Sequence, residues 1–173
     1  MNERAAEVPI IWEFIKKYKG KSVLEVGNVL SHYFSVKHDI LDYYEKAPRV
    51  INQDVVDFSP NKKYDLIVSI STLEHIGFNE KPKEPKKILQ AIKNLKSLLS
   101  KKGKIAVTLP LGFNPEMDKF LREGKMEFSK IYCLKRISKE NEWVETNWEE
   151  IKNSKYNFPF HGANGLIVGV AEK

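Results

Sequence analysis

The 173 residues have the length of one ordinary domain and carry a formal net charge of +6. With 42% hydrophobic and 11% aromatic residues, the chain has enough apolar surface to build a core, which excludes a disordered protein. The basic residues are 25 Lys and only 4 Arg. This balance argues against a dedicated nucleic-acid binder, since recognition of phosphate and guanine usually employs Arg.

The single cysteine, Cys133, excludes an internal disulfide and a cysteine zinc cluster. The sequence also lacks an apolar run of about 20 residues, the length that spans a bilayer. Its first residues do not have the pattern of a secretory signal. We therefore expect a cytoplasmic protein without a membrane segment.

Short apolar runs alternate with helical patterns through the first two thirds of the chain. Each run stops at a polar or turn-forming residue, as expected of a buried strand. The helical patterns place apolar side chains three and four positions apart and end at glycine. In chain order, we predict a helix at 8–18, strands at 22–27, 49–54 and 64–71, a helix at 86–100 and a strand at 104–110. Such alternation predicts a parallel sheet with helices on both faces.

The last third of the chain departs from this alternation. Residues 116–124 predict one more crossover helix, and residues 130–137 and 165–172 predict two strands. The polar stretch between these strands need not contain a crossover helix, so we expect them to pair antiparallel at the sheet edge. We interpret residues 1–173 as a single domain.

Acidic residues at the strand ends are the first candidates for a binding site, because ligands of open α/β sheets bind at the carboxyl ends of the strands. Glu25 stands two residues before Gly27, where the first strand ends. Asp42 and Glu45 follow Glu25 by 17 and 20 residues. That spacing is close to the one expected for an acid that binds ribose hydroxyls. Asp54 ends the strand predicted at 49–54 and can accept a hydrogen bond from an adenine amino group.

Four segments resemble, in order, the motifs of class I S-adenosylmethionine-dependent methyltransferases. They are Val23-Leu-Glu-Val-Gly27-Asn28, Asp54-Val-Val-Asp-Phe, Tyr64-Asp-Leu-Ile-Val-Ser-Ile-Ser-Thr-Leu-Glu-His75 and Leu98-Leu-Ser-Lys-Lys-Gly-Lys-Ile-Ala-Val-Thr-Leu-Pro110. The resemblance implies an α/β, Rossmann-like three-layer sandwich: a mostly parallel seven-stranded sheet with a terminal antiparallel β-hairpin. It also implies S-adenosyl-L-methionine as the cofactor.

The resemblance further assigns roles to single residues. The matching positions are Glu25, Val26, Gly27 and Asn28 around the methionine part of the cofactor, Asp42 at the ribose, Asp54 and Val55 at the adenine, and Ser69, Ile70 and Ser71 at the sulfonium end. The first loop departs from the family, which usually has two or three glycines there, whereas here Gly27 is followed by Asn28-Val-Leu-Ser-His-Tyr33.

The pair Glu74-His75 is a candidate for chemistry. His75 is the candidate catalytic residue, because an imidazole titrates near neutral pH and can act as a general base. In some family members a Glu-x-x-Glu-His arrangement holds a divalent metal with a later His. Here Ser71 stands at the first position and His161 is the later histidine, so a carboxylate is missing and we predict no metal site. In the simplest alternative, Glu74 and His75 begin a helix.

The resulting prediction is a methyltransferase acting on a small-molecule or sugar-like metabolite, which would enter over residues 71–78, 110–115 and 143–162. The glycine-poor loop keeps a second hypothesis open, a catalytically inactive binding or scaffold protein with the methyltransferase fold. A nicotinamide-dependent oxidoreductase is less favoured, because the Gly-x-Gly-x-x-Gly loop is absent. The sequence does not indicate the oligomeric state.

Overall fold

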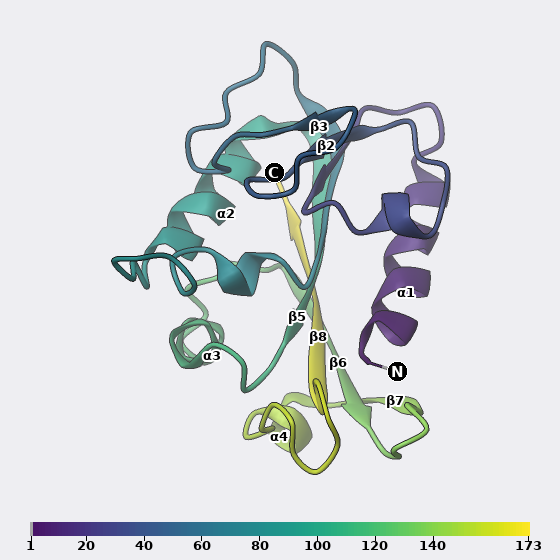
Figure 1. Cartoon of the computed structure of the whole chain (residues 1–173), viewed down its shortest axis with the longest axis vertical. Helices are drawn as coiled ribbons and strands as arrows, with labels where there is room; N and C mark the ends of the chain where they lie inside the picture. Colours follow the sequence, from purple (N-terminus) through teal and green to yellow (C-terminus); the bar gives the residue numbers. More distant parts are fainter. Residues whose placement is uncertain (1) are drawn as a thin grey trace.

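The computed structural model describes residues 2–173, which form one eight-stranded sheet with helices on both faces (Figure 1). The sheet order is β3-β2-β1-β4-β5-β8-β6-β7. The strands are β1 Val23–Val26, β2 Asp39–Leu41, β3 Val50–Ile51, β4 Tyr64–Ile70, β5 Leu99–Pro110, β6 Lys130–Arg136, β7 Trp143–Thr146 and β8 Gly165–Glu172. The first five strands pair in parallel and the last three antiparallel.

The helices lie on opposite faces of this sheet. They are α1 Arg4–Lys17, α2 Lys87–Leu98, α3 Pro115–Arg122 and α4 Trp148–Ile151, with short 3-10 helices η1 Leu30–His32 and η2 Leu73–His75. Helix α1 covers one face of the sheet, and α2 and α3 cover the other (Figure 1). The sheet has an apolar core on each face, because successive side chains of β4 point to opposite sides. Leu66 and Val68 point toward α1, whereas Ile67 points toward α2.

Helix α2 shows why the sequence pattern was informative. Its buried residues are Ile88, Ala91, Ile92, Leu95 and Leu98, which recur at helical spacing. Each large apolar side chain contributes about 1.5–3 kcal/mol by its burial. The helix connects β4 to β5, as predicted for a parallel crossover.

The predicted number of seven strands is corrected to eight. The additional strand is β7, which pairs antiparallel with β6 through Arg136 and Trp143 at one end and Cys133 and Thr146 at the other. Antiparallel neighbours need only a short connection, so a hairpin fits within the polar stretch after β6. The predicted antiparallel pairing of the two terminal strands is confirmed, since β6 and β8 are neighbours.

The connections among β1, β2 and β3 contain no α-helix, and none is predicted from the sequence between residues 27 and 49. Residues 27–38 hold only η1, and residues 42–49 are a short loop. Eight residues are too few for a helical crossover, which usually takes a dozen or more. The groove beside these strands is therefore lined by loops.

The carboxyl ends of β1, β4 and β5 lie at one edge of the sheet, and the first turn of α1 lies there too. Arg4 donates hydrogen bonds to the carbonyl oxygens of Ile70 and Ser71, at the end of β4. This edge gathers the loop after β1, the loop after β2, η2 and the amino end of α1.

Candidate functional site

The buried carboxylate of Glu25 holds the loop after β1 through hydrogen bonds. Its side chain is fully buried, and Oε1 accepts hydrogen bonds from the backbone amides of Val29 and Leu30 at 2.9 and 2.7 Å. Its Oε2 lies 2.7 Å from Nε2 of His38. These contacts use the carboxylate to fix the loop.

Gly27 is the point where the main chain turns out of β1. Its φ of +88° lies in the left-handed region, and a Cβ atom at this position would overlap the side chain of Thr72. Its amide donates to the carbonyl oxygen of Leu41 at 2.8 Å. Glycine is therefore required here both by the backbone angle and by the close approach to Thr72.

Two adjoining hollows lie at this edge. The first hollow has a volume of about 200 Å³ and is lined by Val26, Gly27, Leu41, Asp42, Tyr43, Tyr44, Gln53, Asp54, Val55, Thr72, His75, Ile76, Asn79 and Glu80. The second hollow has a volume of about 380 Å³ and is lined by Arg4, Gly27, Asn28, Val29, His32, Tyr33, Asp42, Glu45 and Thr72. They share Gly27, Asp42 and Thr72, so they form one groove along the carboxyl ends of the strands.

Asp42 lies between the two hollows. Its Oδ1 accepts from the amides of Tyr44 and Glu45, both at 2.8 Å, and its Oδ2 accepts from the amide of Asn28 at 3.0 Å. Since a carboxylate offers about four acceptor positions, one position on Oδ2 remains for a ligand. The three amides also hold the carboxylate in a fixed orientation.

Asp54 lines the first hollow but already has two partners. Its Oδ1 accepts from the amide of Val56 at 3.0 Å, as in a turn or helix cap, and its Oδ2 lies 2.6 Å from Nζ of Lys87. Lys87 also pairs with Glu80 at 2.6 Å. Burial lowers the pKa of Lys87, but the bonds to Asp54 and Glu80 outweigh burial and raise it above its ordinary value. A ligand amino group would therefore share Asp54 with a permanent cation.

The predicted residues at the end of β4 do not line either hollow. Ser69 is buried and donates its hydroxyl to the carbonyl oxygen of Val26 at 2.8 Å. Ile70 is in the core, and the hydroxyl of Ser71 donates to the carboxylate of Glu7 beneath α1. The next residue, Thr72, faces both hollows instead.

His75 lines the first hollow from η2. Its Nδ1 lies 2.8 Å from the side-chain amide of Asn79, and its ring meets that of Phe113 edge to face at 4.7 Å. Burial lowers the pKa of His75 below its ordinary value, against the raising effect of Asn79. The imidazole is consequently neutral at neutral pH and able to accept a proton.

Sequence reasoning missed Thr72, Tyr43 and Tyr44. The two tyrosines are exposed, pack edge to face at 4.8 Å between ring centres and line the first hollow beside Asp42. In the sequence they could have been found as the aromatic pair directly after Asp42, the acid predicted to bind the ribose. Thr72 had no such signal, because its place depends on the loop from β1.

His161, the later histidine considered for a metal site, lies in the loop before β8. Within residues 2–173, no group of three or more His, Cys, Asp and Glu residues is arranged to hold a metal ion. The carbonyl oxygen of His161 accepts a hydrogen bond from Arg136.

No helix among the described residues is both long and apolar enough to cross a membrane.

Known structures share this architecture. The N-methyltransferase NodS of Bradyrhizobium japonicum, in complex with S-adenosyl-L-homocysteine, is 13% identical, with a TM-score of 0.57 over 99% of this chain and 87% of that one. A SAM-dependent methyltransferase from Archaeoglobus fulgidus is 15% identical, with a TM-score of 0.56 over 98% and 94%. A Thermotoga maritima protein described as a possible histamine N-methyltransferase is 14% identical, with a TM-score of 0.52 over 97% of each chain.

These likenesses show the fold of class I SAM-dependent methyltransferases, as the sequence motifs predicted. Comparison of the sequence with family models gives no match, and comparison with curated proteins gives none either. The Rossmann-like arrangement with a terminal antiparallel hairpin is therefore established by structure.

Proposed function

We propose that this protein is a methyltransferase that uses S-adenosyl-L-methionine to methylate a small molecule, including sugar-like metabolites. The observation that carries the proposal is the groove between Gly27, Asp42 and Thr72, which lies at the carboxyl ends of the parallel strands. Ligands of open α/β sheets bind at this edge. The NodS structure with S-adenosyl-L-homocysteine supports the choice of cofactor.

The residues of the groove fit the parts of this cofactor. The open acceptor position of Asp42 suits a ribose hydroxyl, and the apolar side chains of Leu41 and Val55 suit the flat adenine ring. Gly27 lets the main chain approach the ligand where a side chain would block it. When bound, the cofactor supplies an activated methyl group, so the protein itself mainly orients the acceptor and excludes water.

His75 is the group that we propose to hold the acceptor's proton. It lines the first hollow, and its lowered pKa keeps the ring neutral at neutral pH. A neutral imidazole within reach of a protonated nucleophile can act as a general base. The side-chain nitrogen of Asn79 donates to Nδ1, so the proton of the neutral ring lies on Nε2, and Nδ1 becomes free to accept a proton when the acceptor displaces Asn79.

Calorimetric titration with S-adenosyl-L-homocysteine tests the proposal. We expect saturable binding to the wild-type protein and weaker binding to Asp42→Asn, whose side chain has lost its negative charge. NAD titrated under the same conditions serves as the comparison ligand and should not bind. Folded wild-type protein that does not bind S-adenosyl-L-homocysteine would contradict the proposal. Cofactor binding without turnover of any acceptor would instead support the catalytically inactive binding protein.

A further inference from the structure

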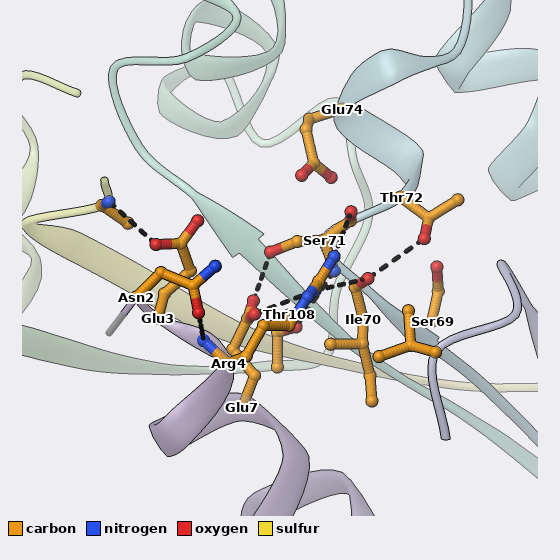
Figure 2. A network of polar contacts seen from close by, with 12 residues as sticks. Asn2, Glu3, Arg4, Glu7, Ser69, Ile70, Ser71, Thr72, Glu74 and Thr108 are labelled. Atoms are coloured by element: carbon orange, nitrogen blue, oxygen red, sulfur yellow. Dashed lines mark hydrogen bonds and ion pairs between the residues drawn. The ribbon is translucent and has the colours of Figure 1, made fainter. Parts of the chain in front are cut away.

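Three buried acidic residues gather where α1 begins, next to the end of β4. Glu3, Glu7 and Glu74 have relative exposures of 6, 0 and 1%. Figure 2 shows Glu3 and Glu7 reaching this place from the start of the chain and Glu74 reaching it from η2. We refer to the carboxyl groups of these residues as the acidic cluster. Such a concentration of buried acid is costly unless cations or donors compensate it.

Both oxygens of Glu3 accept hydrogen bonds within the fold. Its Oε2 accepts from the amide of Ala163 at 3.1 Å, and its Oε1 accepts from the hydroxyl of Tyr156 at 3.2 Å. These contacts tie the start of α1 to the loop before β8. Glu3 therefore has a structural explanation that needs no ligand.

Glu74 has an oxygen that the fold leaves without a partner. Its Oε2 is completely buried and makes no hydrogen bond, while Oε1 lies 3.8 Å from Nε2 of His75. The carboxyl group points toward Ser71, into the acidic cluster (Figure 2). Burial raises the pKa of Glu74 well above its ordinary value, and the nearby carboxylate of Glu7 raises it further. A buried acceptor without a donor is destabilising, so this oxygen marks a place where a donor is missing.

Arg4 shows which kind of group the acidic cluster binds. Its Nη1 contacts Glu7 at 3.0 Å and the carbonyl oxygen of Ile70 at 2.9 Å, and its Nη2 contacts the carbonyl oxygen of Ser71 at 3.3 Å. The same side chain lines the second hollow with Thr72. A cation-binding set of oxygens thus opens onto the proposed cofactor groove, and an Arg side chain of the protein itself fills it.

Aromatic rings stand beside the same acids. Phe113, from the loop after β5, contacts the rings of His75, Phe78 and Tyr156 at 4.7, 5.6 and 5.2 Å. Tyr156 is the residue that bonds Glu3. Tyr156 thereby joins this group of rings to the acidic cluster.

We propose that Glu7, Glu74 and the carbonyl oxygens of Ile70 and Ser71 bind the positively charged nitrogen of an amine substrate, and that Arg4 occupies this site until the amine displaces it. The inference rests on the proposed function and narrows the acceptor to an amine. An alkylammonium group has three donors and no acceptor, which matches a site made only of oxygen acceptors. A sugar hydroxyl is neutral, so it could not replace the positive charge of Arg4 beside the buried carboxylate of Glu7.

The test is a binding measurement on the folded protein with saturating S-adenosyl-L-homocysteine. Butylamine and phenethylamine are titrated by calorimetry, and butanol and 2-phenylethanol are the uncharged matched compounds. We expect saturable binding of at least one amine, with the matched alcohol at least about tenfold weaker because it cannot neutralise the buried charge. Equal affinities for amine and alcohol, or no amine binding, would overturn the amine site.

Isosteric variants locate the binding. Glu74→Gln and Glu7→Gln should each weaken amine binding by about tenfold or more while leaving the affinity for S-adenosyl-L-homocysteine unchanged. The control is Asp65→Asn, at the start of β4, whose carboxylate bonds Ser22 and Ser100 at the other end of the strand. Amine binding that survives in both Glu variants would overturn the assignment of these residues.

Arg4 is tested by two replacements. Arg4→Met removes the competing cation and should raise the affinity for amines, whereas Arg4→Lys keeps a cation and should behave like the wild type. Unchanged affinity in Arg4→Met would contradict its role as occupant. The two proposals fail separately, because absence of S-adenosyl-L-homocysteine binding overturns the proposed function. Cofactor binding without amine binding overturns the amine site alone.

Discussion

Gly27 and Thr72 touch across the edge of the sheet so closely that a single Cβ atom on Gly27 would overlap the threonine side chain. We therefore expect Gly27→Ala to lose affinity for S-adenosyl-L-homocysteine and about 1–3 kcal/mol of stability, since both the contact and the positive φ become unfavourable. Calorimetry and urea unfolding measure the two effects.

The double variant Gly27→Ala with Thr72→Ala separates the two causes. Shortening Thr72 removes the two nearest atoms, Oγ1 and Cγ2, but leaves the Cβ of residue 72 at 2.9 Å and the alanine at φ +88°. We expect partial recovery of stability relative to Gly27→Ala. If the double variant is no more stable, the backbone angle alone accounts for the effect.

Asp42→Asn tests the link between the two hollows. Asparagine keeps one acceptor oxygen but loses the charge and part of the contacts to the amides of Asn28, Tyr44 and Glu45. We expect cofactor affinity to fall by about tenfold or more, the effect of one charge-assisted hydrogen bond. Asp57→Asn on the neighbouring loop is a control, and an equal loss there would argue against a specific role of Asp42.

The raised pKa of Glu74 makes the stability of the protein depend on pH. Its pKa in the folded protein lies well above the ordinary value of 4.5, because burial disfavours the carboxylate. Between the two values the folded state binds more protons than the unfolded state, so the free energy of unfolding falls as pH rises. We expect Glu74→Gln to reduce this fall at pH values above 4.5, as measured by urea unfolding. An unchanged slope would show that Glu74 is charged in the folded protein.

Asp118 makes a similar prediction in a lower pH window. Burial raises the pKa of this carboxyl from 3.8 to about 6, although the amide of Gly112 bonds one oxygen. Wild-type stability should fall by at most about 3 kcal/mol between these values, since one pKa unit corresponds to about 1.4 kcal/mol. Asp118→Asn should flatten the profile in that window alone. If the free energy of unfolding depends on pH in the same way in both proteins, the raised pKa does not belong to Asp118.

His75→Gln tests the proposed base. Glutamine keeps a polar side chain but cannot accept a proton near neutral pH, so kcat should fall at least about tenfold while cofactor affinity is retained. The wild-type pH profile should show an acidic limb below the ordinary pKa of imidazole, because burial lowers the pKa of His75. Equal kcat values for the two proteins would exclude His75 as the base.

The sequence allowed the strands β1, β3, β4 and β5 and the helix α2 to be anticipated, because buried strands and amphipathic helices have local patterns. Asp42, Asp54 and His75 were also found, since strand ends are recognisable in sequence, and all three line the first hollow. Whether they bind cofactor or take part in catalysis stays a prediction.

The remaining features depend on contacts between distant segments. Thr72 faces the groove only because the loop from β1 folds against it, and Ser71 turns away because Glu7 of α1 accepts its hydroxyl. No local spacing connects a helix at the start of the chain with the end of β4. The short edge strand β7 was missed for a related reason, since its four residues gain their structure from pairing with β6.

The contact between Glu3 and the amide of Ala163 has a practical consequence. A peptide tag fused ahead of α1 would lie beside the acidic cluster, whereas β8 ends at the opposite end of the sheet, where Lys173 bonds the carbonyl oxygen of Leu99. Purification handles therefore belong after residue 173, and binding assays with an amino-terminal tag should first be compared with protein from which the tag has been cleaved.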